Sequence, residues 1–248
     1  MEAYQKCIIA FLDILGFKNI INTKAFDEIK NIFLSIIPQE ELMIALGRAA
    51  DDTDENLLRY NATLRETKVH VMSDSIVIAA PVGAPEALTV VIDICNVIQE
   101  QLYSLDTPIF LRGAIAEGDF YLDKNLIFGK GLIDAYIAQE NYAIYPRIIL
   151  SDNLVVGREI SVDGQESLPK DEDGYYYINT LERYIDCESL QELEENERYQ
   201  KMKARIDAEL SGYADGRVRE KYLWLRKELR RIERELGLKE GKLLLHDF

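Results

Sequence analysis

Two aspartates, Asp13 and Asp74, stand in segments whose chemistry suits divalent cations. Asp13 ends the apolar run KCIIAFLD, and Asp74 lies in VMSDS between two short apolar runs. Carboxylates that meet at strand ends can share a pair of hard cations, and carboxylate and phosphate oxygens are the ligands that Mg²⁺ and Mn²⁺ prefer. An aspartate at a strand end is also often only a helix cap, so neither segment is specific by itself. Together they indicate phosphate chemistry that depends on two divalent cations.

Composition limits the functions that the chain can have. With 248 residues, 48% of them hydrophobic, it can bury a core as one domain with an appendage or as two small domains. The formal charge of -15 argues against sequence-independent binding to nucleic acid, whereas a small anion held through metal ions is compatible with it. Cys7, Cys95 and Cys187 are widely spaced, which predicts a reducing compartment and no structural zinc. The chain shows no signal-like start and no apolar run of membrane-spanning length, so we expect a cytoplasmic protein that does not bind membranes.

The two aspartates need elements that bring them together. Residues 6–13 form a run of strand length, and the apolar spacing over 18–35 predicts an amphipathic helix that Pro38 ends. A second helix is expected over 39–50, followed by a solvated acidic loop at 51–56. Residues 64–72 and 75–80 are typical of two strands separated only by Ser73 and Asp74. So short a connection predicts a tight hairpin with Asp74 at its tip.

The pattern continues to about residue 151 and then changes. We expect a helix over 86–103, strands over 109–116 and 125–128, a helix over 132–142 and a strand over 147–150. This order fits an α+β fold with a mixed sheet and helices on one face. From residue 189 onward Glu, Lys, Arg and Leu dominate, and the break at 212–216 predicts a helical hairpin. The expected domains are therefore 1–188 and a helical extension over 189–248, which either decorates the first domain or serves dimerisation or partner binding.

Four segments, in this order, resemble the signature motifs of class III nucleotidyl cyclases. FLDILGF at 11–17 is similar to the family's F-A-D-I-V-G-F, and MSDS at 72–75 stands where those enzymes carry I-G-D-A/S. RGAIAEG at 112–118 resembles their R-x-G-I-x-x-G strand, whose Arg112 we expect to brace the sheet or a dimer interface. FGKGLIDAYIAQE at 128–140 resembles their glycine turn and the helix that follows. The similarity covers about residues 6–151 and implies the family's ferredoxin-like α+β catalytic fold.

The resemblance also implies roles for the residues of the first two motifs. Asp13 and Asp74 would be catalytic and would bind two divalent cations, Mn²⁺ or Mg²⁺, with the backbone carbonyl of Ile14 as a further ligand. One ion would activate the ribose 3′-hydroxyl, and the other would hold the leaving diphosphate. At the start of a helix, backbone amides would cradle the β and γ phosphates. The residues expected to supply these amides are Leu15, Gly16 and Phe17.

Base recognition departs from the purine-specific members of the family. His70 and Leu126 occupy the two positions that read the base in those enzymes, and neither matches the purine code. We therefore take both as base-pocket candidates, although a histidine on an alternating strand can also be structural. Tyr60 and Tyr136 are aromatic candidates for stacking on the base.

In this family one subunit supplies both metal-binding aspartates and the other supplies the helix after the glycine turn. A single catalytic copy without an internal repeat therefore implies a symmetric homodimer with two sites. Asp134 and Ala138 occupy the positions that normally hold Asn and Arg on that helix, so the usual transition-state arginine is missing. The partner-subunit candidates are Asp134, Lys130 and Arg147, and Lys18 is a further source of positive charge for the triphosphate.

Taken together, the motifs are most similar to the bacterial pyrimidine cyclases of the antiphage Pycsar system, which make cyclic UMP or cyclic CMP. Members that consist of little more than the cyclase domain lean toward UTP. The resemblance therefore makes UTP the first choice of substrate and cyclic UMP the expected product. Cyclic CMP and the purine cyclic nucleotides are the alternatives.

Two other interpretations stay open. Polymerase palm domains and diguanylate cyclases also place two carboxylates on a hairpin of a ferredoxin-like sheet, but their hairpin carries a Gly-Gly-Asp/Glu-Glu/Asp-Phe motif that SDS does not match. A polymerase would also need a basic nucleic-acid track. The second interpretation is a degenerate cyclase domain that binds a nucleotide or a partner without catalysis. The loss of the usual Asn and Arg favours it, and the retention of Asp13 and Asp74 opposes it.

Overall fold

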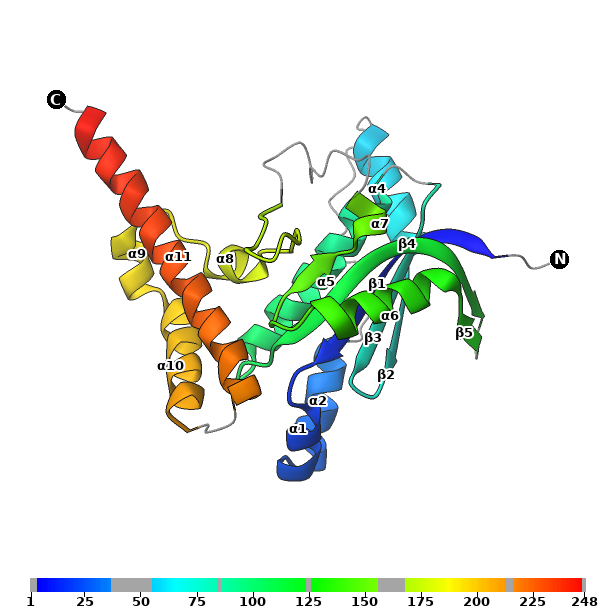
Figure 1. Cartoon of the computed structure of the whole chain (residues 1–248), viewed down its shortest axis with the longest axis horizontal. Helices are drawn as coiled ribbons and strands as arrows, with labels where there is room; N and C mark the ends of the chain where they lie inside the picture. The colour runs from blue at the N-terminus through cyan, green and yellow to red at the C-terminus, as the bar shows by residue number, and fades with distance from the viewer. Residues whose placement is uncertain are drawn as a thin grey trace. The chain divides into compact units, whose positions relative to one another are not determined.

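The structure, a computed structural model, describes residues 4–36, 55–83, 86–123, 126–155, 168–212 and 216–246 (Figure 1). The chain divides into two compact units. The first comprises Met1–Leu102 and Ile109–Ile178, and the second comprises Tyr103–Pro108 and Asn179–Phe248. No helix within the described ranges is both long enough and apolar enough to cross a membrane.

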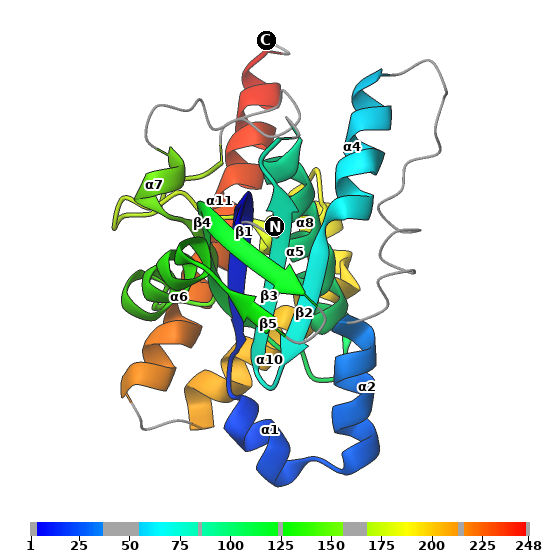
Figure 2. The same ribbon diagram turned by 90° about the vertical axis from the view of Figure 1, so that its right-hand side faces the viewer.

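The first unit is built on a six-stranded mixed sheet (Figure 2). Among the described residues, the strand pairs are antiparallel except that of β4 and β6, which is parallel. Helices connect the first strand to a hairpin and the hairpin to the fourth strand, which is the ferredoxin-like βαββαβ arrangement. The α+β prediction is therefore confirmed. In spatial order the strands are β2 (Lys68–Met72), β3 (Ser75–Pro81), β1 (Gln5–Ile14), β4 (Leu111–Asp123) and β5 (Leu126–Phe128), and β6 (Ile148–Leu150) pairs with β4.

Strand β1 is apolar on both faces, which decides how the sheet is covered. Successive side chains of a strand point to opposite faces, so Ile9 and Phe11 lie on one face and Ile8 and Ala10 on the other. Helix α6 (Lys130–Tyr142) covers the face that carries Ile9. Helix α5 (Ala87–Ser104) lies on the other face (Figure 2). The prediction of helices on one face is therefore wrong, because a strand with two apolar faces must be covered on both.

The segment after β1 forms two helices where the apolar spacing predicts one. Helix α1 spans Phe17–Thr23 and α2 spans Phe26–Ile36. Lys24 between them is extended, and the Glu28 carboxylate accepts a hydrogen bond from the Ala25 amide over 3.1 Å. This contact caps the start of α2 and stops α1 from continuing. Pro38 and the predicted helix at 39–50 lie outside the described residues.

Helix α4 (Glu55–Glu66) corrects two further expectations, a loop through residue 56 and a strand from residue 64. Its Tyr60 and Leu64, four residues apart, are both buried. Residues at this spacing lie on one face of a helix, and their burial outweighs the acidic, loop-like start of the segment. Strand β2 accordingly begins only at Lys68. The remaining predicted loop residues, 51–54, lie outside the described residues.

The other predicted elements of the first unit are confirmed, with one extension. Helices α5 and α6 and strands β3 and β6 match their predicted ranges closely. Strand β4 continues past the predicted end to Asp123 and pairs with β5, with Tyr121 opposite Phe128. A short helix, α7 (Asp152–Val155), follows β6.

The second unit is helical, and the predicted hairpin is confirmed. Its helices α8 (Thr180–Ile185), α9 (Leu190–Glu195), α10 (Glu197–Gly212) and α11 (Gly216–His246) follow one another along the chain. Buried residues of α10 recur at helical spacing, as Tyr199, Met202, Ile206 and Leu210. They form the apolar face that packs in the helical hairpin.

Candidate functional site

Backbone contacts bring Asp13 and Asp74 to the same end of the sheet. The antiparallel register pairs Asp13 with Ser75, and the Ile14 amide donates a hydrogen bond to the Asp74 carbonyl over 2.9 Å. Asp74 lies in the two-residue turn between β2 and β3, where Ser73 has a φ of 58°. In Figure 2 this turn and the end of β1 lie at the same end of the sheet. The predicted hairpin with Asp74 at its tip is thus confirmed.

The turn after Asp13 leads directly into α1. Gly16 has a φ of 75°, a left-handed conformation that favours glycine, and its carbonyl accepts hydrogen bonds from the Asn19 and Ile20 amides. The Leu15 amide donates to the Phe110 carbonyl over 2.9 Å. The expectation that the Leu15 amide binds phosphate is therefore corrected, because this donor is engaged within the chain. Phosphate binding by the amides of Gly16 and Phe17 stays a prediction.

An arginine contacts the first aspartate directly. Arg112 lies opposite Asp13 in the register of β1 and β4, and its Nε donates to Asp13 Oδ2 over 2.7 Å. The two side chains are only 19% and 20% exposed, so solvent screens this ion pair less than a surface pair. Arg112 Nη2 lies 3.5 Å from Glu140 Oε2 on α6. The guanidinium therefore bridges two carboxylates from different elements and competes with any cation for Asp13.

Helix α6 crosses the same face of the sheet as Asp13. Phe11 shares this face because it lies two residues before Asp13 on β1, and its ring packs edge-on against Tyr136 at 5.4 Å between centroids. The helix approaches the sheet closely at two glycines. A Cβ on Gly118 would lie 2.5 Å from Gly131 Cα, so neither position has room for a side chain. Gly118 of the third motif and Gly131 of the fourth therefore allow α6 to pack closely against β4.

The three base-pocket candidates lie on three different elements. Tyr60 is 6% exposed, and its hydroxyl donates to Asp93 Oδ2 over 2.8 Å between α4 and α5. This residue is part of the core, and its assignment to a base pocket is corrected. His70 lies on β2 and Leu126 on β5, the strands at opposite ends of the strand order. Their roles in a base pocket stay predictions.

The candidates for positive charge differ in how far they are engaged. The Arg147 side chain is fully buried and forms ion pairs with Asp171 and Asp173. Its guanidinium is used inside the first unit, so its proposed contact with a triphosphate is corrected. Lys130 and Asp134 form an ion pair with each other over 2.5 Å on α6. Lys130 is 75% exposed, and the roles of this pair toward a partner subunit stay predictions.

The donor set at the strand ends fits a hard divalent cation. Asp13 and Asp74 are both partly exposed and offer carboxylate oxygens, and the adjoining Ile14 offers a backbone carbonyl. Mg²⁺ is typically held by one or two carboxylates, with water and substrate phosphates completing its shell. Among the residues that the structure describes, no group of three or more His, Cys, Asp or Glu is placed to hold a metal ion. A cation at this point would therefore need ligands from a bound phosphate or water.

Sulfur chemistry is disfavoured at all three cysteines. Burial raises the pKa of Cys7 to about 11 and also raises the pKa of Cys95 and of Cys187. The thiols therefore stay protonated at neutral pH, and a protonated thiol is a poor nucleophile and a poor metal ligand.

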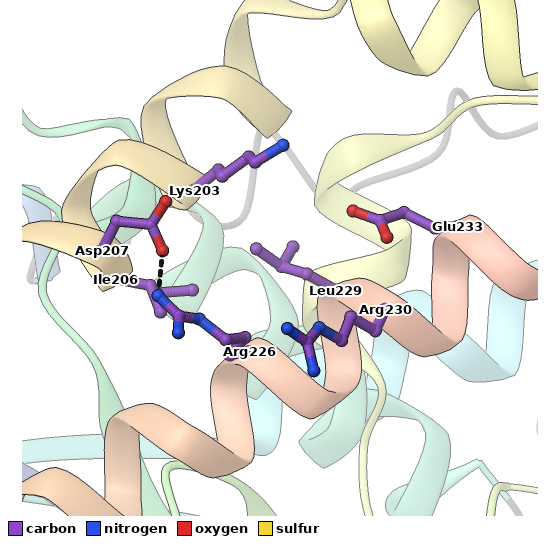
Figure 3. A pocket seen from close by; sticks show the side chains of 7 residues that line it. All are labelled: Lys203, Ile206, Asp207, Arg226, Leu229, Arg230 and Glu233. Atoms are coloured by element: carbon purple, nitrogen blue, oxygen red, sulfur yellow. Dashed lines mark hydrogen bonds and ion pairs between the residues drawn. The ribbon is translucent and has the colours of Figure 1, made fainter. Parts of the chain in front are cut away.

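A hollow of about 290 Å³ lies between α10 and α11 in the second unit (Figure 3). Its side chains carry charges of both signs around Ile206 and Leu229. Asp207 is paired with Arg226, and Glu233 accepts a hydrogen bond from the Tyr199 hydroxyl. Asp207 and Glu233 lie on opposite sides of the hollow in Figure 3. Both acidic side chains of the hollow are therefore already engaged within the second unit.

Comparison with known proteins gives structural similarity alone. No family model matches the chain. No curated protein matches it either. Among solved structures, the guanylyl cyclase Cya2 is similar over 71% of this chain and 94% of its own, with 12% identity and a TM-score of 0.44. The guanylyl cyclase domain of the RhoGC fusion protein from the aquatic fungus Blastocladiella emersonii is similar over 62% of this chain and 83% of its own, with 18% identity and a TM-score of 0.40. The adenylyl cyclase CyaB from P. aeruginosa is similar over 71% and 94%, with 13% identity and a TM-score of 0.39.

Proposed function

We propose that this chain is a nucleotidyl cyclase that converts UTP to 3′,5′-cyclic UMP and diphosphate. The observation that carries the proposal is the backbone pairing at the end of β1. Asp13 stands opposite Ser75, and the Ile14 amide donates to the Asp74 carbonyl, so the backbones of the two aspartates adjoin at one end of the sheet. The ordered motifs around them resemble those of class III nucleotidyl cyclases. The same resemblance supports a role of the product as a second messenger in bacterial antiphage defence.

Asp13 and Asp74 would act together as ligands of the cations, with Mn²⁺ or Mg²⁺ as the metal. Bound divalent ions supply a lowered pKa for an attacking hydroxyl and charge neutralisation for a leaving phosphate. The chain contributes the positions of the two carboxylates, which the register of β1 with β3 sets. The glycine at position 16 lets the chain turn sharply after Asp13, so that the start of α1 adjoins the carboxylates. The amides of Gly16 and Phe17 would then face the phosphates.

Arg112 would govern access to Asp13. Its guanidinium pairs with the same carboxylate that the cations require. Cation binding would therefore weaken this pair, and Glu140 on α6 is placed to keep the guanidinium within the site. This arrangement offers a positive charge next to the phosphates at a position other than the family's usual transition-state arginine.

A homodimer is supported by an apolar stripe on α6. Ile133, Tyr136 and Ile137 follow helical spacing and are 56%, 48% and 45% exposed. Exposed apolar groups of this kind mark contact surfaces. The stripe lies on the helix that would serve the partner's site, and a twofold axis would complete two sites at once.

The choice of a pyrimidine rests on the absence of both purine-reading residues at His70 and Leu126. A smaller base needs a narrower pocket, and His70 offers a polar contact for its edge. If the imidazole reads uracil, His70→Ala should relax the preference for UTP over ATP more than it lowers turnover of UTP. Size alone typically discriminates by about 10- to 200-fold, whereas polar contacts reach further. Equal loss with every nucleotide would mark His70 as structural.

The proposal is tested by incubating the full-length chain with each of the four ribonucleoside triphosphates and Mn²⁺ and identifying the products by mass and chromatography. Cyclic UMP as the main product supports it. Cyclic CMP as the main product would show that the substrate is CTP and not UTP. Efficient formation of cyclic AMP or cyclic GMP would overturn the pyrimidine assignment. The absence of any cyclic product would overturn the catalytic role and favour a domain that only binds nucleotides.

A further inference from the structure

A buried glutamine joins α5 to the start of β4. Gln99 is 3% exposed, its Nε2 donates to the Ile109 carbonyl over 3.0 Å, and its Oε1 accepts from the Leu111 amide over 2.7 Å. One side chain thus binds the backbone on both sides of Phe110. Because side-chain amides can donate and accept at the same time, glutamine is suited to this double contact.

The backbone that Gln99 holds is in direct contact with the candidate site. The Phe110 carbonyl, between the two bonds of Gln99, accepts the Leu15 amide over 2.9 Å. Two residues later, Arg112 pairs with Asp13. The segment 109–112 therefore touches both the turn after Asp13 and the Asp13 carboxylate.

We propose that Gln99 is a positioning residue for the cation site, an inference that rests on the proposed function. It holds the segment 109–112 so that the turn 13–16 keeps the position in which Asp13 adjoins Asp74. The turn is then fixed from two sides, by the Asp74 carbonyl at Ile14 and by the Phe110 carbonyl at Leu15. Gln99 itself touches neither cation nor nucleotide.

The effect of Gln99 on the turn follows from its hydrogen bond to the Leu111 amide. Leu111 is fully buried, so its amide would stay unsatisfied if the Gln99 side chain were lost. An unsatisfied buried donor favours a shift of the backbone that carries it. A shift at 109–111 moves the Phe110 carbonyl away from Leu15 and so releases one of the two contacts that hold the turn.

The test uses Gln99→Met, which keeps the length of the side chain and removes both hydrogen bonds. Tyr60→Phe is the matched control, because it also removes a buried hydrogen bond to α5, at Asp93, away from Asp13. Amide hydrogen exchange of residues 12–20 and Mn²⁺ affinity without nucleotide, by electron paramagnetic resonance, are measured on the full chain. Gln99→Glu, which keeps an acceptor for Leu111, serves as a second variant should Gln99→Met not fold.

We expect exchange at residues 12–20 to become about tenfold faster in Gln99→Met and to stay unchanged in Tyr60→Phe. Because partners of metal ligands typically affect metal affinity by roughly 10- to 100-fold, we expect a loss of about tenfold in Mn²⁺ affinity for this more distant residue. Faster exchange confined to residues 109–111, with unchanged Mn²⁺ affinity, would overturn the inference. A parent chain that bound no Mn²⁺ would overturn the proposed function, and the exchange at 12–20 would still decide whether Gln99 holds the turn.

Discussion

The end of β1 and the α10–α11 hairpin use charged residues in opposite ways. In the helical unit, charges of opposite sign are matched locally: Arg231 contacts Glu228 and Glu235 on its own helix and Glu182 on α8. At the end of β1, the backbone pairing places two aspartates at the same end of the sheet, with Arg112 beside one of them.

This difference indicates which charges serve structure and which serve chemistry. A matched network needs no ligand, because each charge finds its partner within the unit. In the proposed site the two aspartates would repel each other, and a cation bound between them would stabilise the pair. The strand end is therefore the part of the molecule where a ligand is expected, although the helical hairpin contains far more charged residues.

The largest effect is expected at the two aspartates. Asp13→Asn or Asp74→Asn should lower the rate of cyclic nucleotide formation about a thousandfold, because carboxamides bind hard cations poorly and metal ions supply several kcal/mol to such reactions. The rate is measured with UTP and Mn²⁺, and thermal unfolding checks that the fold is kept. Asp207→Asn in the helical unit is the control and should leave the rate unchanged. An equal loss of rate in Asp207→Asn would contradict the assignment of the chemistry to the end of β1.

The helical unit should respond in stability. Arg231→Met removes the ion pairs of Arg231 with Glu182, Glu228 and Glu235, of which Glu228 is buried, and this should lower the free energy of unfolding by about 3 kcal/mol. Thermal and urea unfolding measure this loss, and turnover per folded molecule should change little. The matched control is Arg234→Met on the same helix, where the side chain is exposed and the change should be small. Similar stability of the two variants would contradict the structural role of the network.

At Arg112 we expect a smaller effect, which is a gain in cation affinity and not a loss. Arg112→Gln removes the cation that competes for Asp13, so Mn²⁺ binding without nucleotide should tighten by about tenfold, the worth of one charge-assisted hydrogen bond. Titration calorimetry measures the affinity. Lys6→Gln at the other end of β1 removes the same charge and should have little effect, since Lys6 pairs with the exposed Asp119. Weaker binding in Arg112→Gln would show that the arginine organises the site and does not block it.

The smallest effect is expected at Tyr60. Tyr60→Phe removes a buried hydrogen bond to Asp93 and should lower the free energy of unfolding by about 1 kcal/mol. The ratio of activity with UTP to activity with ATP should not change, because the ring lies in the core between α4 and α5. A changed ratio of the two activities would show that Tyr60 contributes to base recognition.

The features that could be predicted from the sequence depend on neighbouring residues. The apolar run before Asp13 marks a buried strand, and the two-residue gap before Ser75 marks a hairpin. Both signals lie within a few residues, so the position of the two aspartates at strand ends follows from them.

The features that could not be predicted depend on contacts between distant segments. The pairing of Arg112 with Asp13 follows from the register of β1 with β4, and no local pattern encodes a register. Arg147 is neutralised by Asp171 and Asp173 in a later loop, and Gln99 binds backbone groups ten and twelve residues further along the chain. In the sequence these polar residues look like surface residues, because only the folded structure shows that they are buried.

The central claim, that Asp13 and Asp74 form one cation site, is tested most directly by Mn²⁺ binding in a double-mutant cycle. Electron paramagnetic resonance measures bound Mn²⁺ in the parent, in Asp13→Asn, in Asp74→Asn and in the double variant. If the carboxylates act as one unit, each single variant should lose nearly as much affinity as the double variant, because removing either ligand breaks the site. Additive losses from the two single variants, or Mn²⁺ binding that survives in the double variant, would contradict it.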